Sequence, residues 1–306
     1  MGREVSQIYS LAIKPPFPRA AAKEARGCFE AGKDKLMAVS RDKRLGLMAV
    51  PIAVLAVLPA SPGAAQQAGA ATTADSASLI DPAAMAAMDK MSAALQTLPS
   101  FQVQSDVTSE VVLVTGQKIQ FGGTVDVAVH RPDAFKVVSR ADTQTREMYY
   151  NGKTFTIYAP KLGYYASFDA PSTIGLTLDK ARTEHNIEVP LADLFTWGTD
   201  QTVRSRVKEA IVVRPERIGD RQCMHYAFRQ EKVDWQVWID QGAQPLPCKL
   251  VITSRTDEAM PQYTAVLNWT LNSVPEAASL AFQPPADAKR ITMASAATLA
   301  KAEGEQ

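Results

Sequence analysis

From Phe101 onward, apolar and polar residues alternate along most of the chain, and this period of two constrains the fold more than any other feature. Such alternation is typical of strands with one buried face. About ten such runs follow one another between turn residues, and no βαβ rhythm accompanies them. The pattern therefore predicts an α+β fold built on a curled antiparallel sheet.

The strongest turn signal is Asn151-Gly152, which lies between the apolar runs 148–150 and 155–157. Asn-Gly suits the two positive φ angles of a type I′ turn. We therefore predict a tight hairpin of this type.

The late strands, residues 222–229, 233–240 and 248–254, are close enough in sequence for their register to be predicted. If Phe228 lies opposite Trp235, one face of these strands is continuously aromatic and aliphatic. The pairs expected on that face are Phe228–Trp235, Tyr226–Val237, Met224–Ile239, Trp235–Ile252 and Val237–Leu250. The residues expected on the other face are Arg229, Asp234, Gln236, Trp238 and Lys249. Truncating Trp238 is then expected to cost less stability than truncating Trp235, unless the helical insertion at 172–197 covers it.

Asp81-Pro82 predicts the start of a helix, with Asp81 as the N-cap and Pro82 at the first helical position. Pro99 ends this helix. Its apolar stripe is Ala84, Met88, Met91, Leu95 and Leu98. One such helix cannot cover about ten strands. We therefore expect the sheet to wrap over it as an unclosed β-barrel and to leave a groove or cavity.

Residues 172–197 interrupt the strands with two expected short helices, one capped by Ser172 and one opened by Pro190. This insertion has too many apolar side chains for a solvated loop, so we expect it to lie over the open side of the sheet as a lid. The expected lid residues are Ile174, Leu178, Leu194, Phe195 and Trp197.

The N-terminal third reads as a targeting segment. Arg41, Lys43 and Arg44 precede an apolar run at 45–58, and small residues follow it, as in a secretory signal peptide. The run is shorter than the roughly 20 residues that span a membrane. The alternative is an uncleaved anchor or a buried helix.

The organisation that follows has five parts. We expect an upstream extension at 1–36, which a wrongly assigned start would explain, and a signal peptide at 37–65. A flexible linker at 66–78, one domain at 79–293 and a disordered tail at 294–306 complete it. Cleavage after Ala65 or Ala70 would begin the mature chain between Gln66 and Ala71. No Cys follows the apolar run as a lipid-attachment site, so we expect a soluble periplasmic protein.

The balanced net charge and the absence of known catalytic motifs exclude several classes of function. Lys and Arg total 33 against 32 Asp and Glu, so no basic excess suggests nucleic acid. Cys223 and His225 share a strand face, but structural zinc needs about four ligands. The sequence shows no nucleophile elbow and no HExxH motif. We expect no metal, no cofactor, no nucleic-acid partner and no catalysis.

Cys223 and Cys248 are the thiols that remain after cleavage, and export makes a disulfide the default expectation. Strand alternation argues against it, because Cys248 falls on the apolar face with Leu250 and Cys223 on the other with His225. The two also flank an intervening strand, about 9–10 Å apart at twice the usual strand spacing. A disulfide tolerates only about 7 Å between Cα atoms. We therefore predict two free thiols.

Four segments resemble a known family: residues 223–229 (CMHYAFR), 234–240 (DWQVWID), 245–253 (PLPCKLVIT) and 282–288 (FQPPADA). They are similar to an uncharacterised family of predicted periplasmic proteins in the LolA/LolB lipoprotein-carrier superfamily. The resemblance spans residues 79–293. It implies an unclosed β-barrel over helices, an apolar inner face and binding of acyl chains. The superfamily includes lipid-binding lipoproteins and a stress-sensing regulator.

We therefore expect a monomeric periplasmic carrier for an apolar ligand, either a lipid or an acylated protein. The expected apolar wall is Met148, Tyr150, Phe155, Ile157, Tyr226, Phe228, Trp235, Val237, Leu250, Ile252, Leu267 and Trp269. Two alternatives stay open. The same side chains would simply fill a core, or the domain would sense envelope stress and act on a regulatory protein partner. An enzyme is a third alternative.

Overall fold

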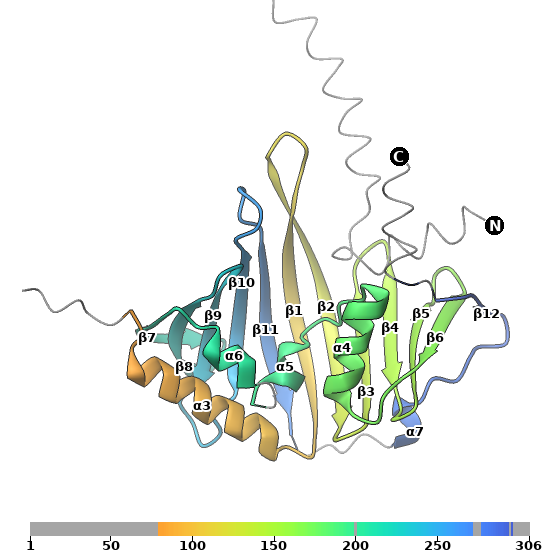
Figure 1. Ribbon diagram of the computed structural model, residues 1–306, viewed down its shortest axis with the longest axis horizontal. Coiled ribbons are helices and arrows are strands. Elements are labelled where there is room, and N and C mark those ends of the chain that lie inside the picture. Colours follow the sequence, from red (N-terminus) through yellow and green to blue (C-terminus); the bar gives the residue numbers. More distant parts are fainter. Residues whose placement is uncertain (1–78, 199–200, 272–276, 294, 296–306) are drawn as a thin grey trace, which may run out of the picture. The chain divides into compact units, whose positions relative to one another are not determined.

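The computed structural model of the chain describes residues 79–198, 201–271, 277–293 and Ser295. The expected upstream extension, signal peptide and linker, and all of the expected tail but Ser295, lie outside these residues. The described part is one large sheet with helices packed on it (Figure 1). The helices are α3 (Pro82–Thr97), α4 (Ile174–His185), α5 (Asp193–Thr196), α6 (Gln201–Ser205) and α7 (Ala277–Leu280).

The sheet has 12 strands in the order β12-β6-β5-β4-β3-β2-β1-β11-β10-β9-β8-β7, so the chain's first and last long strands, β1 and β11, meet in its middle. In chain order the strands are β1 (Ser100–Val112), β2 (Lys118–His130), β3 (Ala134–Arg140), β4 (Thr145–Tyr150), β5 (Thr154–Ala159), β6 (Tyr164–Asp169), β7 (Glu209–Ile218), β8 (Arg221–Arg229), β9 (Val233–Asp240), β10 (Pro247–Ser254), β11 (Gln262–Thr270) and β12 (Lys289–Arg290). Neighbours are antiparallel except β12, which runs parallel to β6. The edges β7 and β12 do not meet, so the predicted unclosed sheet is confirmed, with two more strands than expected.

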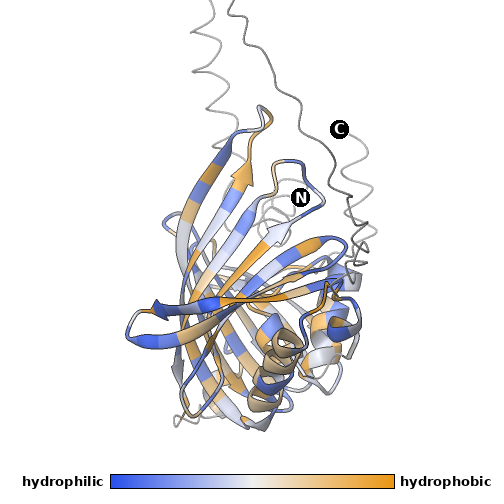
Figure 2. Cartoon of the chain, turned by 90° about the vertical axis from the view of Figure 1, so that its left-hand side faces the viewer, coloured by the Kyte–Doolittle hydropathy of each residue, from blue (hydrophilic) through white to orange (hydrophobic). Residues whose placement is uncertain are grey.

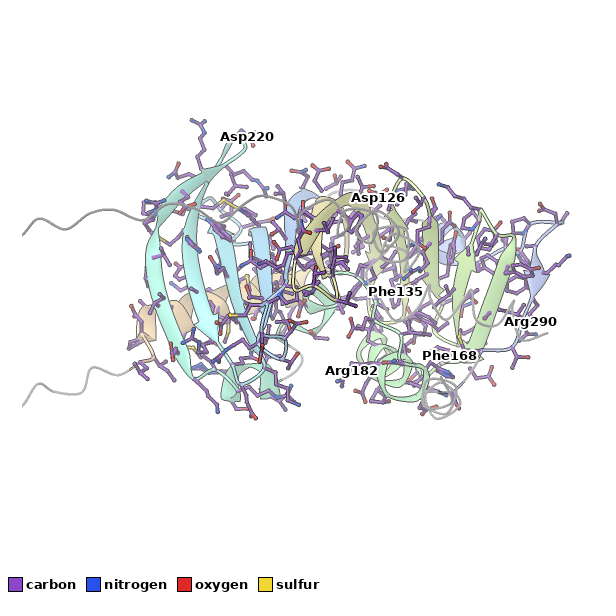
Figure 3. The ribbon with its side chains drawn as sticks, turned by 90° about the horizontal axis from the view of Figure 1, so that it is seen from above. Asp126, Phe135, Phe168, Arg182, Asp220 and Arg290 are labelled. Atoms are coloured by element: carbon purple, nitrogen blue, oxygen red, sulfur yellow. A yellow bond between two sulfur atoms is a disulfide. The ribbon has the colours of Figure 1, made fainter. Side chains whose placement is uncertain are left out.

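The two faces of the sheet differ in what covers them. We call the face that packs against α3, α4 and α5 the inner face; Phe135 lies on it. Asp126 lies on the opposite, outer face (Figure 3). Apolar and polar residues alternate along several of the long strands (Figure 2), as in β1 and β2, which is what a sheet with one buried face requires.

Helix α3 forms as predicted. The Asp81 carboxylate accepts a hydrogen bond from the Ala83 backbone N–H at 2.8 Å, and Pro82 occupies the first turn. The residues that the helix buries are Ala84, Met85, Met88, Met91 and Leu95. Leu98 forms the C-cap.

The predicted register of the late strands is confirmed. Phe228 pairs with Trp235, and Trp235 pairs with Ile252. The remaining expected pairs are also present: Tyr226–Val237, Met224–Ile239 and Val237–Leu250. One face of β8, β9 and β10 therefore presents an aromatic and aliphatic surface to the helices.

The β4–β5 hairpin forms, but the predicted type I′ turn is wrong. That turn needs two positive φ angles, and only Gly152 has one, at 83°. Asn151 instead uses its side-chain oxygen to accept hydrogen bonds from the backbone N–H groups of Lys153 and Thr154, at 3.2 and 2.9 Å. This side-chain turn holds a longer loop, since Tyr150 pairs with Phe155.

The insertion at 172–197 is helical as expected, with one change of cap. Thr173, not Ser172, caps α4 by accepting a hydrogen bond from the Leu176 N–H at 3.4 Å. The second expected helix is α5, but Pro190 does not open it: the helix begins at Asp193, with Ala192 as the N-cap. A further short helix, α6, follows it and was not predicted from the sequence.

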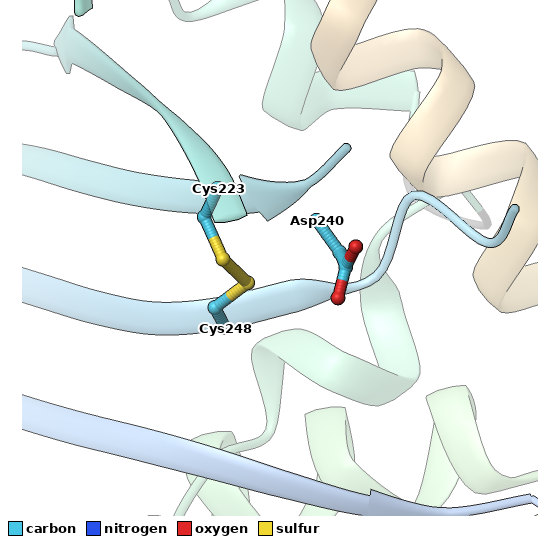
Figure 4. A group of neighbouring side chains, drawn as sticks. All are labelled: Cys223, Asp240 and Cys248. Carbon is cyan, nitrogen blue, oxygen red and sulfur yellow. A yellow bond between two sulfur atoms is a disulfide. The ribbon is translucent and has the colours of Figure 1, made fainter. Parts of the chain in front are cut away.

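The prediction of two free thiols is wrong, because Cys223 and Cys248 form a disulfide (Figure 4). The register slips by one residue between Pro247 and Lys249, so Cys248 lies in a β-bulge and faces outward beside Lys249. Cys223 pairs with Asp240, the last residue of β9, so the bridge crosses the end of that strand. The two Cα atoms are 6.8 Å apart, within disulfide range.

Trp238 lies on the outer face as predicted, but it is not the more exposed tryptophan. Trp235 is 6% exposed and Trp238 5%. The cover is not the insertion: the His225 ring stacks on Trp238 at 3.9 Å and the Lys249 ammonium lies 4.6 Å from its ring centroid. The disulfide packs in the same cluster. The expected difference in stability cost between the two tryptophans therefore loses its basis.

Candidate ligand-binding site

The inner face is closed over much of its area by aromatic packing. Phe195 of α5 lies between two strands, with ring centroids 5.3 Å from Phe135 and 6.5 Å from Phe101. Phe135 also packs on Tyr150 at 5.5 Å and on Phe155 at 6.1 Å. The insertion therefore contributes side chains to the core itself, and does not only rest on it.

All the residues of the expected wall belong to this core. Tyr226, Ile252 and Trp269 are partly buried. The fully buried members are Met148, Tyr150, Phe155, Ile157, Phe228, Trp235, Val237, Leu250 and Leu267. Strands β1, β2 and β3 separate the members on β4 and β5 from those on β8 to β11. Most of the expected wall thus packs in the interior of the domain.

The lid residues are buried in the same core. Ile174, Leu178, Leu194, Phe195 and Trp197 are all buried against the sheet. Trp197 faces Trp235 of β9 with ring centroids 6.0 Å apart. Leu176, on the other side of α4, is 58% exposed.

A pocket of about 690 Å³ remains between the insertion and strands β9 and β10. Three members of the expected wall, Trp235, Leu250 and Ile252, line it from the sheet. Leu178 and Trp197 line it from the helices, so it brings wall and lid together. Its volume lies within the roughly 300–1,000 Å³ of small-molecule sites.

Charged groups surround the mouth of this pocket. Arg182 forms an ion pair with Asp179 at 2.8 Å on α4, and Arg206 is exposed. Asp193 is half-buried in the lining, where burial raises the pKa of its carboxyl and the negative charge of Glu188 raises it further. The lining therefore contains one carboxyl whose charged form burial disfavours, together with exposed and ion-paired charges.

Sequence reasoning missed a set of polar side chains on the inner face. Their buried atoms have no hydrogen-bond partner in the described part of the chain: Ser105 Oγ, Ser109 Oγ, Arg146 Nε and Nη2, and Tyr263 Oη. Each lies an even number of residues from core residues on its strand and so faces the same side of the sheet, as Arg146 does with Met148 and Tyr150. A polar residue at an apolar position of an alternating strand was the signal that could have found them.

Arg131, in the turn after β2, holds the insertion to the sheet. Its guanidinium donates a hydrogen bond to the Leu194 carbonyl at 3.4 Å and lies 5.9 Å from the Phe101 ring centroid. Burial lowers the pKa of this side chain. The contact joins α5 to the loop between β2 and β3 by a polar interaction as well as by packing.

The outer-face cluster does not provide a metal site. Cys223, Cys248 and Asp240 offer ligand atoms within 4.8 Å of one another. The two sulfur atoms are bonded to each other, however, and a disulfide supplies no thiolate.

The family is identified by sequence. Residues 84–294 match the family described as "Predicted periplasmic protein (DUF2092)". The chain belongs to this family. The match covers nearly all of the described sheet and its helices, and it confirms the resemblance to a family of predicted periplasmic proteins. No curated protein sequence matches the chain.

Several solved structures are similar at low sequence identity. Lipoprotein LppX from Mycobacterium tuberculosis is 16% identical, with a TM-score of 0.39 over 64% of this chain and 98% of that one. The Pseudomonas aeruginosa MucA/MucB complex gives 14% identity and a TM-score of 0.40, over 69% of this chain and 64% of that one. A LolA superfamily protein from Nitrosomonas europaea gives 12% and 0.29, over 63% and 94%.

Among residues 79–198, 201–271, 277–293 and 295, none of the helices is both long and apolar enough to cross a bilayer.

Proposed function

We propose that this DUF2092 protein is a non-catalytic, monomeric periplasmic binding protein for an apolar ligand, a lipid or the acyl chain of a lipoprotein. The observation that carries the proposal is the pocket between the insertion and strands β9 and β10, which Trp197 lines from the insertion and Trp235 from the sheet. Apolar linings with a few polar groups at the edge are typical of such sites. Export with cleavage before a mature start between Gln66 and Ala71 is part of the proposal.

The C-terminal part of the insertion is suited to open over this pocket because its helix α5 has only four residues and is too short to be stable by itself. The position of α5 depends on the apolar contacts of Leu194, Phe195 and Trp197 with the sheet. Docked apolar surface stabilises at about 25 cal/mol per Å², so an acyl chain of similar area could replace part of it.

Tryptophan fluorescence tests the proposal, because a brominated palmitate quenches only the rings that it approaches. Binding should quench Trp197 and Trp235, so Trp197→Phe and Trp235→Phe should each lower the fraction of emission that is quenched. Trp238→Phe is the matched control on the outer face, and it should lower the unquenched part instead. Quenching that is absent, or equal for all three variants, would reject the pocket as the site.

An interaction domain that reports envelope stress to a protein partner is the second candidate, and edge strand β7 favours it. Ile211, Val212 and Val213 are 53%, 37% and 42% exposed at one end of the sheet. Exposed apolar edge strands pair readily with another chain. Ile211→Lys should weaken association with such a partner, whereas Val114→Lys, at a turn where the side chain is even more exposed, should not. Equal effects of the two substitutions would show that β7 is not the edge that binds the partner.

A further inference from the structure

Arg146 is a buried cation for which the described residues provide no counter-charge. It lies on β4 and is 7% exposed. Strand parity places it on the inner face with Met148 and Tyr150, both of them core residues. Its cross-strand partner on β3 is Ser139, which is 8% exposed. The guanidinium therefore lies among apolar and hydroxyl side chains.

Two of the three nitrogens of this guanidinium are unsatisfied in the described part of the chain. Its Nε and Nη2 atoms are buried and have no hydrogen-bond partner among the described residues. The acids of neighbouring strands are on the outer face, where Glu147 accepts a hydrogen bond from Tyr149 and Asp126 pairs with Arg140. By contrast, Arg229 on β8 binds both Asp234 and Glu209.

The charge persists in spite of burial. Burial lowers the pKa of Arg146 to about 10, which still leaves the side chain protonated at neutral pH. A buried charge without a partner is costly and is kept only where something else compensates it. The hydroxyls of the same cross-strand row, Ser139 on β3 and Ser105 on β1, can add hydrogen bonds but no negative charge.

We propose that Arg146 binds the acidic headgroup of the apolar ligand, so that the ligand class is a single-chain amphiphile with a carboxylate or phosphate at one end. This inference rests on the proposed binding function and narrows it. Arg146 does not line the pocket at β9 and β10, so the acyl chain would run from that pocket along the inner face to β4 and displace the insertion's side chains between them. The planar guanidinium suits a two-oxygen anion, which it can bind through two parallel hydrogen bonds. Met148 and Ile157, paired across β4 and β5, are buried beside it, and the start of the chain would replace part of their packing.

The test compares palmitate with methyl palmitate, which has the same chain and no charge. The purified protein should bind palmitate about 10- to 100-fold more tightly, as expected for a hydrogen-bonded charge. Arg146→Met should abolish that preference and leave the affinity for methyl palmitate unchanged. Arg146→Lys should keep part of the preference. Arg140→Met, on the outer face of β3, is the matched control and should keep all of it.

The outcomes separate this inference from the proposed function. If the wild type binds both ligands equally, or if Arg146→Met keeps the preference, the headgroup site is rejected. The proposed binding function is not contradicted by either result. Acetate tests whether the site takes any free anion: competition at the concentrations at which palmitate binds would also reject the inference. If neither lipid binds to the wild type, the proposed function fails and this inference with it. Arg146→Met should unfold no earlier than the wild type, since it removes an unpaired buried charge.

Discussion

Trp235 and Trp238 are neighbours on β9 and equally withdrawn from solvent, yet they belong to different parts of the molecule. Trp235 stacks on Phe228 at 4.0 Å, faces Trp197 and lines the pocket. Trp238 donates a hydrogen bond to Glu216 at 3.0 Å and stacks on His225 beside the disulfide. Trp235 thus lies in an apolar environment beside the pocket, whereas Trp238 is packed among polar side chains and the disulfide. Burial alone therefore does not identify a binding site. A candidate residue must also line an open space, as Trp235 does and Trp238 does not.

The largest expected effect is the cost of removing either ring. Trp235→Ala and Trp238→Ala should each lower the free energy of unfolding by about 3–5 kcal/mol, because both leave a cavity in a packed cluster. Denaturant unfolding of the two variants measures this. A cost near zero for Trp238→Ala would mean that the outer-face cluster is not packed as described.

The disulfide should stabilise the outer-face cluster by a slightly smaller amount. It joins residues 25 apart in sequence, and closing such a loop contributes about 3 kcal/mol through the unfolded chain. Replacing Cys223 and Cys248 together by Ala should lower stability by that amount and leave acyl-chain binding unchanged. The thiol count gives an independent check, since denatured, unreduced protein should show neither thiol to an alkylating reagent. Uptake at both would contradict the bridge.

The sequence predicted the facing of these strands but not what covers their outer side. Alternation in β8 and β9 gave the register of Phe228 with Trp235 because both strands are regular. It failed at Cys248 because a bulge reverses parity there. Pro247, which has no N–H for the ladder, was the available signal. The size of the pocket was out of reach, since it depends on how the insertion's side chains pack.

A smaller effect separates the two tryptophans by chemistry. Trp238→Phe keeps a ring but loses the hydrogen bond to Glu216, so it should lower stability by about 1 kcal/mol and leave ligand affinity unchanged. Trp235→Phe should weaken acyl-chain binding, because the indole ring of Trp235 lines the pocket and phenylalanine has a smaller ring. Parallel unfolding and binding measurements on the two variants test the contrast. If both variants bind like the wild type, Trp235 does not contact the ligand.

Hydrogen exchange with and without a fatty acid tests the central claim most directly, namely that the insertion opens over a lipid site. In the free protein, amides of 174–197 should exchange well before those of the strands at 222–254, because elements that open belong to the least stable part of a fold. Palmitate should change exchange in 174–197 more than anywhere else in the domain. Equal protection of the two regions, with no change on adding palmitate, would show that the insertion is simply core and would contradict the account.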